Sequence, residues 1–205
     1  MILQGEGVSL DFKQTISDAP KIARTLVAFA NNKGGTLLVG VRDNGSLSGI
    51  RSEDERYMLE MAGHMYCRPA IEVKMTEHEV DGKIIIEAIV AEGRDKPYYA
   101  KDTDGKWWVY HRVHDKSLQA SAVMFQVIRK KSATAGTMLS FSYLETRLID
   151  YLTLHPGTAL NEIVKAMEVQ RHRIVHSLAK LIYFNILKVD FMNKSEVYFV
   201  QQTVT

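Results

Sequence analysis

Hydrophobic residues near the start of the chain first follow the period of a strand and then that of a helix. Leu10 and Phe12 alternate with Asp11 and Lys13, which predicts a half-buried strand whose two charged residues project from one polar face. Residues 18–34 then carry apolar side chains at helical spacing between an initial aspartate and a final glycine pair, residue types preferred at helix ends. The pattern therefore predicts a strand followed directly by a capped helix.

The strongest apolar run, residues 36–41, is apolar or small at both side-chain parities, which is typical of a strand in the middle of a sheet. The elements predicted after it are a helix following Ser52, strands at 70–75, 83–90 and 107–113, and a helix at 121–130. Five residues of the second of these strands are expected to be buried in the sheet, namely Ile84, Ile85, Ile86, Ile89 and Val90.

The pattern changes after residue 130. Residues 131–139 are small or polar without apolar periodicity, which predicts an exposed linker. Three helical stripes and two strand-like runs follow, at 144–152, 160–167, 174–182, 186–191 and 196–200. Three helices followed by a hairpin are similar to a winged helix, a helix-turn-helix variant. We therefore expect an α+β domain with a mixed sheet and flanking helices at 1–130, the linker at 131–139, and a small winged helix-turn-helix domain at 140–205.

Composition narrows the function only slightly. Of the 205 residues 46% are hydrophobic and 24% are charged, which is ordinary for a globular protein. A formal net charge of +2 is too small to indicate a nucleic-acid partner without local clustering. No apolar run reaches the ~18 residues of a membrane span, and the first residues lack a signal-peptide pattern. We therefore expect a cytoplasmic protein with no membrane partner, in which the single cysteine, Cys67, is a core residue.

Several motifs around the central strand resemble the Schlafen-type AlbA domain. They fall in the order and local spacing of that family: Glu6, Asp11-Phe12-Lys13, Ala28-Phe29-Ala30-Asn31-Asn32, Gly34-Gly35, Gly40-Val41 and Asp43-Asn44-Gly45. The resemblance is specific over residues 6–50 and weaker up to residue 121. Asp11 departs from the glutamate that is usual in the family, and Asn32 departs from the common threonine.

The resemblance implies one enzymatic hypothesis. In vertebrate Schlafen proteins the acids that match Glu6, Asp11 and Asp43 form a divalent-metal-dependent RNA-cleaving site, so these three are candidate catalytic residues and candidate ligands of Mg²⁺ or Mn²⁺. Glu6 must lie in a loop that folds back if the three are to converge. In the alternative, Asp11 pairs with Lys13, Asp43 begins a turn and Glu6 is solvated. The chain has no Walker A sequence, which disfavours ATP hydrolysis, and no other cofactor is expected.

Basic residues carry a competing hypothesis of nucleic-acid binding. The candidates are Arg171, His172, Arg173, His176 and Lys180 on the third C-terminal helix, Lys194 in the hairpin turn, and Lys13 and Arg112 in the first domain. The donors on the helix can reach phosphates or base edges from the major groove. Arg112 resembles an arginine that ends a strand in the family. The alternative is that the helix presents a solvated face on a winged helix used for dimerisation.

Two adjacent tryptophans, Trp107 and Trp108, can stack nucleic-acid bases, although alternating strand positions favour a core position for at least one of them. The sequence as a whole favours a nucleic-acid-binding protein, in particular a DNA-binding transcriptional regulator that is a homodimer and prefers DNA to RNA. Two alternatives stay open: a metal-dependent ribonuclease that uses the acidic trio, and an interaction or dimerisation module without catalysis.

Overall fold

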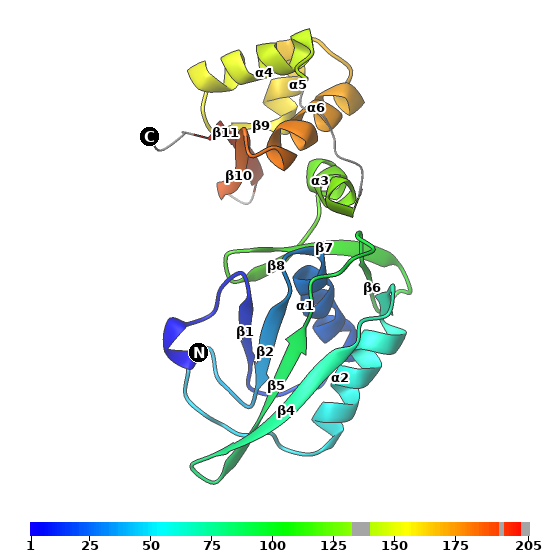
Figure 1. The fold of residues 1–205 in the computed structure, drawn as a ribbon, viewed down its shortest axis with the longest axis vertical. Coiled ribbons are helices and arrows are strands. Elements are labelled where there is room, and N and C mark those ends of the chain that lie inside the picture. The colour runs from blue at the N-terminus through cyan, green and yellow to red at the C-terminus, as the bar shows by residue number, and fades with distance from the viewer. Residues whose placement is uncertain (133–139, 193–194, 202–205) are drawn as a thin grey trace. The chain divides into compact units, whose positions relative to one another are not determined.

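The structure, a computed structural model, describes residues 1–132, 140–192 and 195–201 (Figure 1). The chain divides into two units, Met1–Ala120 and Ser121–Thr205. This boundary lies before the predicted one at residue 130, because helix α3 (Ala122–Ser132) packs against helix α6 (Arg171–Tyr183) and shares its core. Residues 133–139 of the predicted linker lie outside the described residues.

The first unit contains a four-stranded mixed sheet with the apolar run at its centre. The strand order is β1 (Leu10–Lys13), β2 (Gly35–Val39), β5 (Lys83–Val90) and β4 (Val73–Val80). β2 is parallel to β1 and antiparallel to β5, and β4 and β5 form a hairpin. Leu37, Leu38 and Val39 are buried, which confirms the prediction of a central strand covered on both faces.

A second sheet lies on the other side of helix α1 (Ala19–Asn31). It is antiparallel, with the order β3 (Cys67–Arg68), β6 (Tyr99–Lys101), β7 (Trp107–Val113) and β8 (Lys116–Gln119). The side chains of α1 share one core with residues of both sheets. Asp18 caps the helix by accepting a hydrogen bond from the Lys21 amide at 3.1 Å, as its sequence pattern predicts. The packing of both sheets therefore depends on α1.

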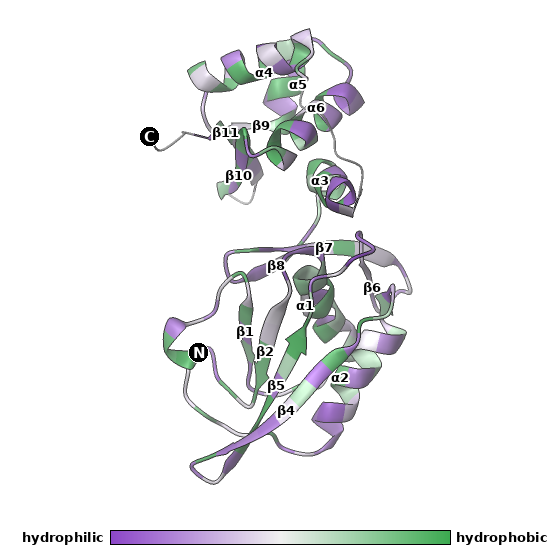
Figure 2. Cartoon of the chain, viewed as in Figure 1, coloured by the Kyte–Doolittle hydropathy of each residue, from purple (hydrophilic) through white to green (hydrophobic). Residues whose placement is uncertain are grey.

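Helix α2 (Asp54–Met65) packs against α1 and β4. Figure 2 shows β5 as mostly hydrophobic, whereas its neighbour β4 carries many hydrophilic residues. The prediction that Ile84 and Ile89 are buried is wrong, since they are 44% and 41% exposed. Ile84 lies next to the hairpin turn, and Ile89 points to the sheet face opposite to Ile86, which belongs to the core around α1.

The glycine pair before β2 is explained by close packing. A β-carbon at Gly34 would lie 2.6 Å from the carbonyl oxygen of Val90, and one at Gly35 would lie 2.4 Å from the Phe29 ring. Gly34 also has a φ of +78°, in the left-handed region that favours glycine. The pair therefore lets the end of α1 approach β5 directly.

In its described residues, the second unit combines four helices with a small antiparallel sheet. After α3 the elements are α4 (Tyr143–Leu154), β9 (Thr158–Ala159), α5 (Leu160–Met167), α6, and the hairpin of β10 (Leu187–Met192) and β11 (Ser195–Val200). Leu148, Ile163 and Leu178, one from each predicted helical stripe, are fully buried together. The three helices and the hairpin predicted for this region are thus confirmed. None of the helices in the described ranges is long and apolar enough to cross a membrane.

Candidate nucleic-acid interface and acidic cluster

A buried ion pair joins the two sheets of the first unit. Asp11 on β1 and Arg112 on β7 are 3% and 6% exposed, and Asp11 Oδ1 lies 3.1 Å from Arg112 Nη1. Lys13 places its Nζ 2.7 Å from the other carboxylate oxygen of Asp11. The expected pairing of Asp11 with Lys13 is therefore present. The expectation that β1 is half-buried with one polar face is wrong, because Asp11 on that face is buried. The charges of Arg112 and Lys13 compensate its carboxylate.

The guanidinium of Arg112 is occupied by contacts within the first unit. Its Nη2 donates a hydrogen bond to the carbonyl of Gly7 at 2.6 Å, and its Nη1 donates one to Ser117 Oγ at 3.2 Å. Its Cζ also lies 5.1 Å from the centroid of the Phe29 ring. With 1% of its side chain exposed, Arg112 cannot reach a nucleic acid in this conformation. The structure gives no support to the predicted binding role, because Arg112 neutralises Asp11 and holds the N-terminal loop on β7.

The loop that carries Glu6 folds back onto β1, as convergence of the acidic trio requires. Glu6 Oε1 accepts a hydrogen bond from the Phe12 amide at 2.8 Å. Partial burial raises the pKa of Glu6, and the negative charges of Asp11 and Asp43 raise it further. The Phe12 amide and the Lys13 ammonium oppose this shift without cancelling it. The three carboxylates therefore share one electrostatic environment.

This arrangement does not fit a divalent cation. Both oxygens of Asp11 already face cationic groups, so a metal ion there would be repelled by Arg112 and Lys13. One oxygen of Glu6 is taken by a backbone amide, and Asp43 is exposed. Across the described ranges, no group of three or more His, Cys, Asp or Glu side chains is placed to hold a metal ion. The catalytic role of the trio stays a prediction that the geometry does not support.

Asn31 is a structural residue whose role sequence reasoning missed. It is buried at the end of α1, where its Nδ2 donates to the carbonyls of Tyr98 and Tyr110, both at 2.9 Å. Its Oδ1 accepts a hydrogen bond from the Tyr98 amide at 2.8 Å. An asparagine supplies both the donors and the acceptor that this position needs. The available signal was an amide residue at an otherwise apolar helix end, three positions before the glycine pair.

The predicted basic strip is present on the amino-terminal half of α6. Its exposed members are Arg171, His172, Arg173 and His176. The helix contains no acidic residue, and its buried face carries Ile174 and Leu178. Residues 168–170 separate α5 from α6, the turn length of a helix-turn-helix. Arg171 Nη1 donates a hydrogen bond to Asn161 Oδ1 at 2.7 Å, which ties the start of α6 to α5.

Lys180 does not belong to this exposed strip. Its Nζ lies 3.0 Å from Glu145 Oε2 and also donates to the carbonyl of Ser140, so the side chain connects α6 with the start of α4. Burial raises the pKa of Glu145, but the hydrogen bond from Ser142 and the charge of Lys180 outweigh it, so that the pKa lies below its usual value. The expected nucleic-acid contact of Lys180 is therefore replaced by a structural ion pair. Lys194 lies outside the described residues.

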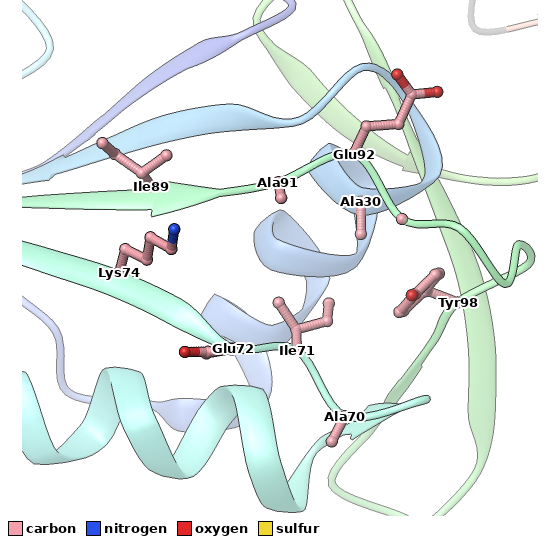
Figure 3. Close-up of a pocket in the computed structure, with 10 residues that line it drawn as sticks. Ala30, Ala70, Ile71, Glu72, Lys74, Ile89, Ala91, Glu92 and Tyr98 are labelled. Atoms are coloured by element: carbon pink, nitrogen blue, oxygen red, sulfur yellow. The ribbon is translucent and has the colours of Figure 1, made fainter.

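A cavity of about 260 Å³ opens beside the end of α1 (Figure 3). Figure 3 shows Ala30, Ile71 and Tyr98 around this cavity. Lys74 on β4 and Glu72 in the segment before β4 also line the cavity. Its volume lies below the ~300 Å³ at which small-molecule pockets usually begin. Among the residues that the structure describes, no predicted site residue lines this cavity, and its mixed charges select no ligand class.

A mixed sheet and an antiparallel sheet packed around α1, with a buried Asp–Arg pair between β1 and β7, define the first unit as an α+β domain of the AlbA type. The sequence model named "Schlafen, AlbA_2" matches residues 6–121, more than half of the chain. The chain therefore belongs to the Schlafen AlbA_2 family. This confirms the resemblance proposed from the motifs around β2. Among curated proteins, none matches the sequence significantly.

Two solved structures share a coarse likeness with the chain. The DIP2311 protein from Corynebacterium diphtheriae is 18% identical over 83% of this chain, with a TM-score of 0.48. This chain covers 32% of that protein, about a third of its length. The N-terminal domain of a RecG-related protein from Nitrosomonas europaea is 21% identical over 67% of this chain and 87% of that domain, with a TM-score of 0.39.

Proposed function

We propose that this protein binds nucleic acid, and that its second unit is a winged helix that docks on duplex DNA through α6. One observation carries the proposal: the amino-terminal half of α6 is exposed and cationic, and the helix has no acidic residue that would repel phosphates. In helix-turn-helix proteins the first residues of the second helix contact base edges in the major groove. The position of Arg171, His172 and Arg173 agrees with that geometry.

The surroundings of Arg171 and Arg173 suggest different roles for the two arginines. Arg171 is held by Asn161, which fixes its guanidinium at the junction of α5 and α6. Arg173 is exposed two residues further from the turn and is available for a phosphate or a guanine edge. The amino end of a helix also attracts anions through its free amide groups and its dipole. Local structure and charge thus favour the same polyanionic partner.

The half-site logic of such modules motivates the hypothesis of a dimer. We propose a DNA-binding transcriptional regulator that acts as a homodimer, with the first unit supplying the dimer contact, a sensed ligand or a second nucleic-acid surface. Multi-angle light scattering of the full chain tests the dimer. A monomeric mass at high protein concentration would exclude it.

The sharpest test of DNA binding is the Arg173→Ala variant, because Arg173 is exposed and its loss leaves the Arg171–Asn161 hydrogen bond intact. Removal of one phosphate contact lowers the slope of log K against log salt by about 0.9 for duplex DNA. Lys21→Ala, which removes an exposed cation from the first unit, is the matched control and should keep the wild-type slope. Equal slopes for wild type and Arg173→Ala would remove Arg173 from the set of phosphate contacts.

The alternative of a metal-dependent ribonuclease is disfavoured by the cations that flank Asp11. It predicts cleavage of structured RNA in the presence of Mn²⁺, and loss of cleavage when Glu6, Asp11 and Asp43 are replaced together by alanine. We expect no cleavage above the level of this variant. Cleavage by the wild-type protein that disappears in the variant would make the ribonuclease the leading function.

A further inference from the structure

The second sheet of the first unit displays both tryptophans of the chain at the beginning of β7. Trp107 is 36% exposed and Trp108 is 37% exposed, so the expectation that at least one is a core residue is wrong. Indole rings are large and mostly apolar, and they are highly buried on average. Their exposure at adjacent positions of one strand is not explained by core packing.

Trp107 shares one face of its sheet with two cations. Lys101 is its direct partner in the β6–β7 register, and Arg68 lies on the next strand, paired with Tyr99. Lys101 Nζ and Arg68 Cζ are each 5.9 Å from the centroid of the Trp107 ring, within the range of a cation–π interaction. We call Arg68, Lys101 and Trp107 the cation–tryptophan face.

Trp108 has a different environment on the opposite face of the strand. Its Nε1 donates a hydrogen bond to Asp102 Oδ2 at 2.8 Å. This hydrogen bond lowers the pKa of Asp102, so the carboxylate is negatively charged at neutral pH. The charged partners of Trp107 are therefore cations, whereas the hydrogen-bond partner of Trp108 is an anion. The two adjacent residues offer a comparison within one strand.

We propose that the cation–tryptophan face binds single-stranded nucleic acid, with a base stacked on Trp107 and adjacent phosphates held by Arg68 and Lys101. Stacking on an aromatic side chain contributes about 1–3 kcal/mol per base and tolerates any base, because each base has a π-face. Paired bases inside a duplex are already stacked on each other, so an exposed indole favours unpaired strands. This site lies in the first unit and does not depend on the proposed duplex contact of α6.

Other ligand classes fit this face less well. A cationic ligand would be repelled by Arg68 and Lys101. An apolar partner would remove both charges from water without supplying a counter-charge, which is costly. A phosphodiester strand provides anionic groups for the two cations and an aromatic plane for the ring, so it matches both features of the face.

The test uses the full chain and an oligothymidylate of about 16 nucleotides, which forms no duplex. Trp108→Phe leaves Trp107 as the single tryptophan, and Trp107→Leu leaves Trp108 as the single tryptophan. We expect a saturable change of tryptophan fluorescence in the first variant and none in the second. The affinity for the labelled oligonucleotide, measured by anisotropy, should fall roughly 5- to 150-fold in Trp107→Leu.

A second variant addresses the charges without removing the ring. Arg68→Ala with Lys101→Ala should lower the salt slope for the oligonucleotide by about 1.4, since each single-strand phosphate contact contributes about 0.7. Arg173→Ala should bind the oligonucleotide as the wild type does, and Trp107→Leu should bind duplex DNA as the wild type does. The proposal is overturned if the wild type does not bind the oligonucleotide, if Trp107→Leu binds it with wild-type affinity, or if Arg173→Ala loses this binding equally.

Discussion

At the scale of single residues, the main feature of the first unit is the buried ion pair between Asp11 and Arg112. The pair spans 101 positions of the sequence, and each partner is almost fully buried. Removing water from two charges is costly, and their attraction repays the cost only when the geometry and the surrounding hydrogen bonds are good. Gly7 and Ser117 supply such hydrogen bonds to Arg112. The Asp-Phe-Lys motif on β1 therefore has a structural explanation in this protein.

Replacement of Asp11 by Asn should destabilise the first unit by about 3–5 kcal/mol, because it leaves the buried guanidinium of Arg112 without its counter-charge. Urea unfolding followed by tryptophan fluorescence measures this, since both tryptophans lie in the first unit. The double variant Asp11→Leu with Arg112→Met removes both charges and should be less destabilised than Asp11→Asn. If the double variant is the less stable of the two, the ion pair does more than neutralise charge.

At the scale of elements, polar residues fix how helices meet their neighbours. Asn31 joins the end of α1 to β7 and to the segment before β6 through three buried hydrogen bonds. In the second unit Glu145 binds the Ser142 amide at 2.7 Å and pairs with Lys180, so that it connects the start of α4 with α6. Asn31 thus satisfies backbone groups of Tyr98 and Tyr110, and Glu145 satisfies the amide of the residue that caps α4.

The Glu145 contact predicts a pH dependence of the second unit. The pKa of Glu145 is lowered in the folded state, so its contribution is fully present above the unfolded pKa and is lost as the pH falls through the folded pKa. The difference in unfolding free energy between wild type and Glu145→Gln should therefore shrink when the pH falls from about 7 to about 3. Far-UV circular dichroism during urea unfolding provides the measurement.

Glu162 offers a matched control, since it holds the equivalent position in α5 but is exposed and accepts a hydrogen bond from the Ala159 amide at 3.3 Å. Glu162→Gln should show a smaller pH-dependent difference. A difference between wild type and Glu145→Gln that is constant across the pH range would contradict the assigned role of Glu145.

At the scale of the whole molecule, the two units have separate hydrophobic cores. The core around α1 contains Leu26 and Ile86, and that of the second unit contains Leu148 and Leu178. No buried residue belongs to both of these clusters in the described part of the chain. The proposed duplex-binding surface and the proposed single-strand face belong to different units, so each can be altered without removing the other.

Leu178→Ala should destabilise the second unit by about 2–5 kcal/mol, because it leaves a cavity at a fully buried position of α6. The unfolding transition reported by tryptophan fluorescence, which belongs to the first unit, should keep its midpoint. Circular dichroism, which observes both units, should show the early loss of helix. A parallel shift of the fluorescence midpoint would show that the two units unfold as one.

Much of the fold can be predicted from sequence because the signals are local. The apolar run at residues 36–41, the alternation around Phe12 and the three C-terminal stripes each define an element within a few residues. The motifs around β2 also pointed to the family that matches residues 6–121, and in this structure the glycine pair allows the end of α1 to approach β5 closely. Local periodicity carries this information because it reflects the geometry of one helix or one strand.

By itself, then, the sequence predicted the main helices and the longer strands in their order, the family resemblance and the cationic half of α6, but not the short strands β3, β6, β8 and β9. The tertiary structure decided that Asp11 and Arg112 are buried together, that Lys180 pairs with Glu145, that α3 packs in the second unit, and that both tryptophans remain exposed. These outcomes depend on which distant surfaces meet, and burial of a charge is decided by partners that can lie a hundred residues away. A local sequence pattern does not identify such distant partners, whereas the tertiary structure shows which residues are in contact.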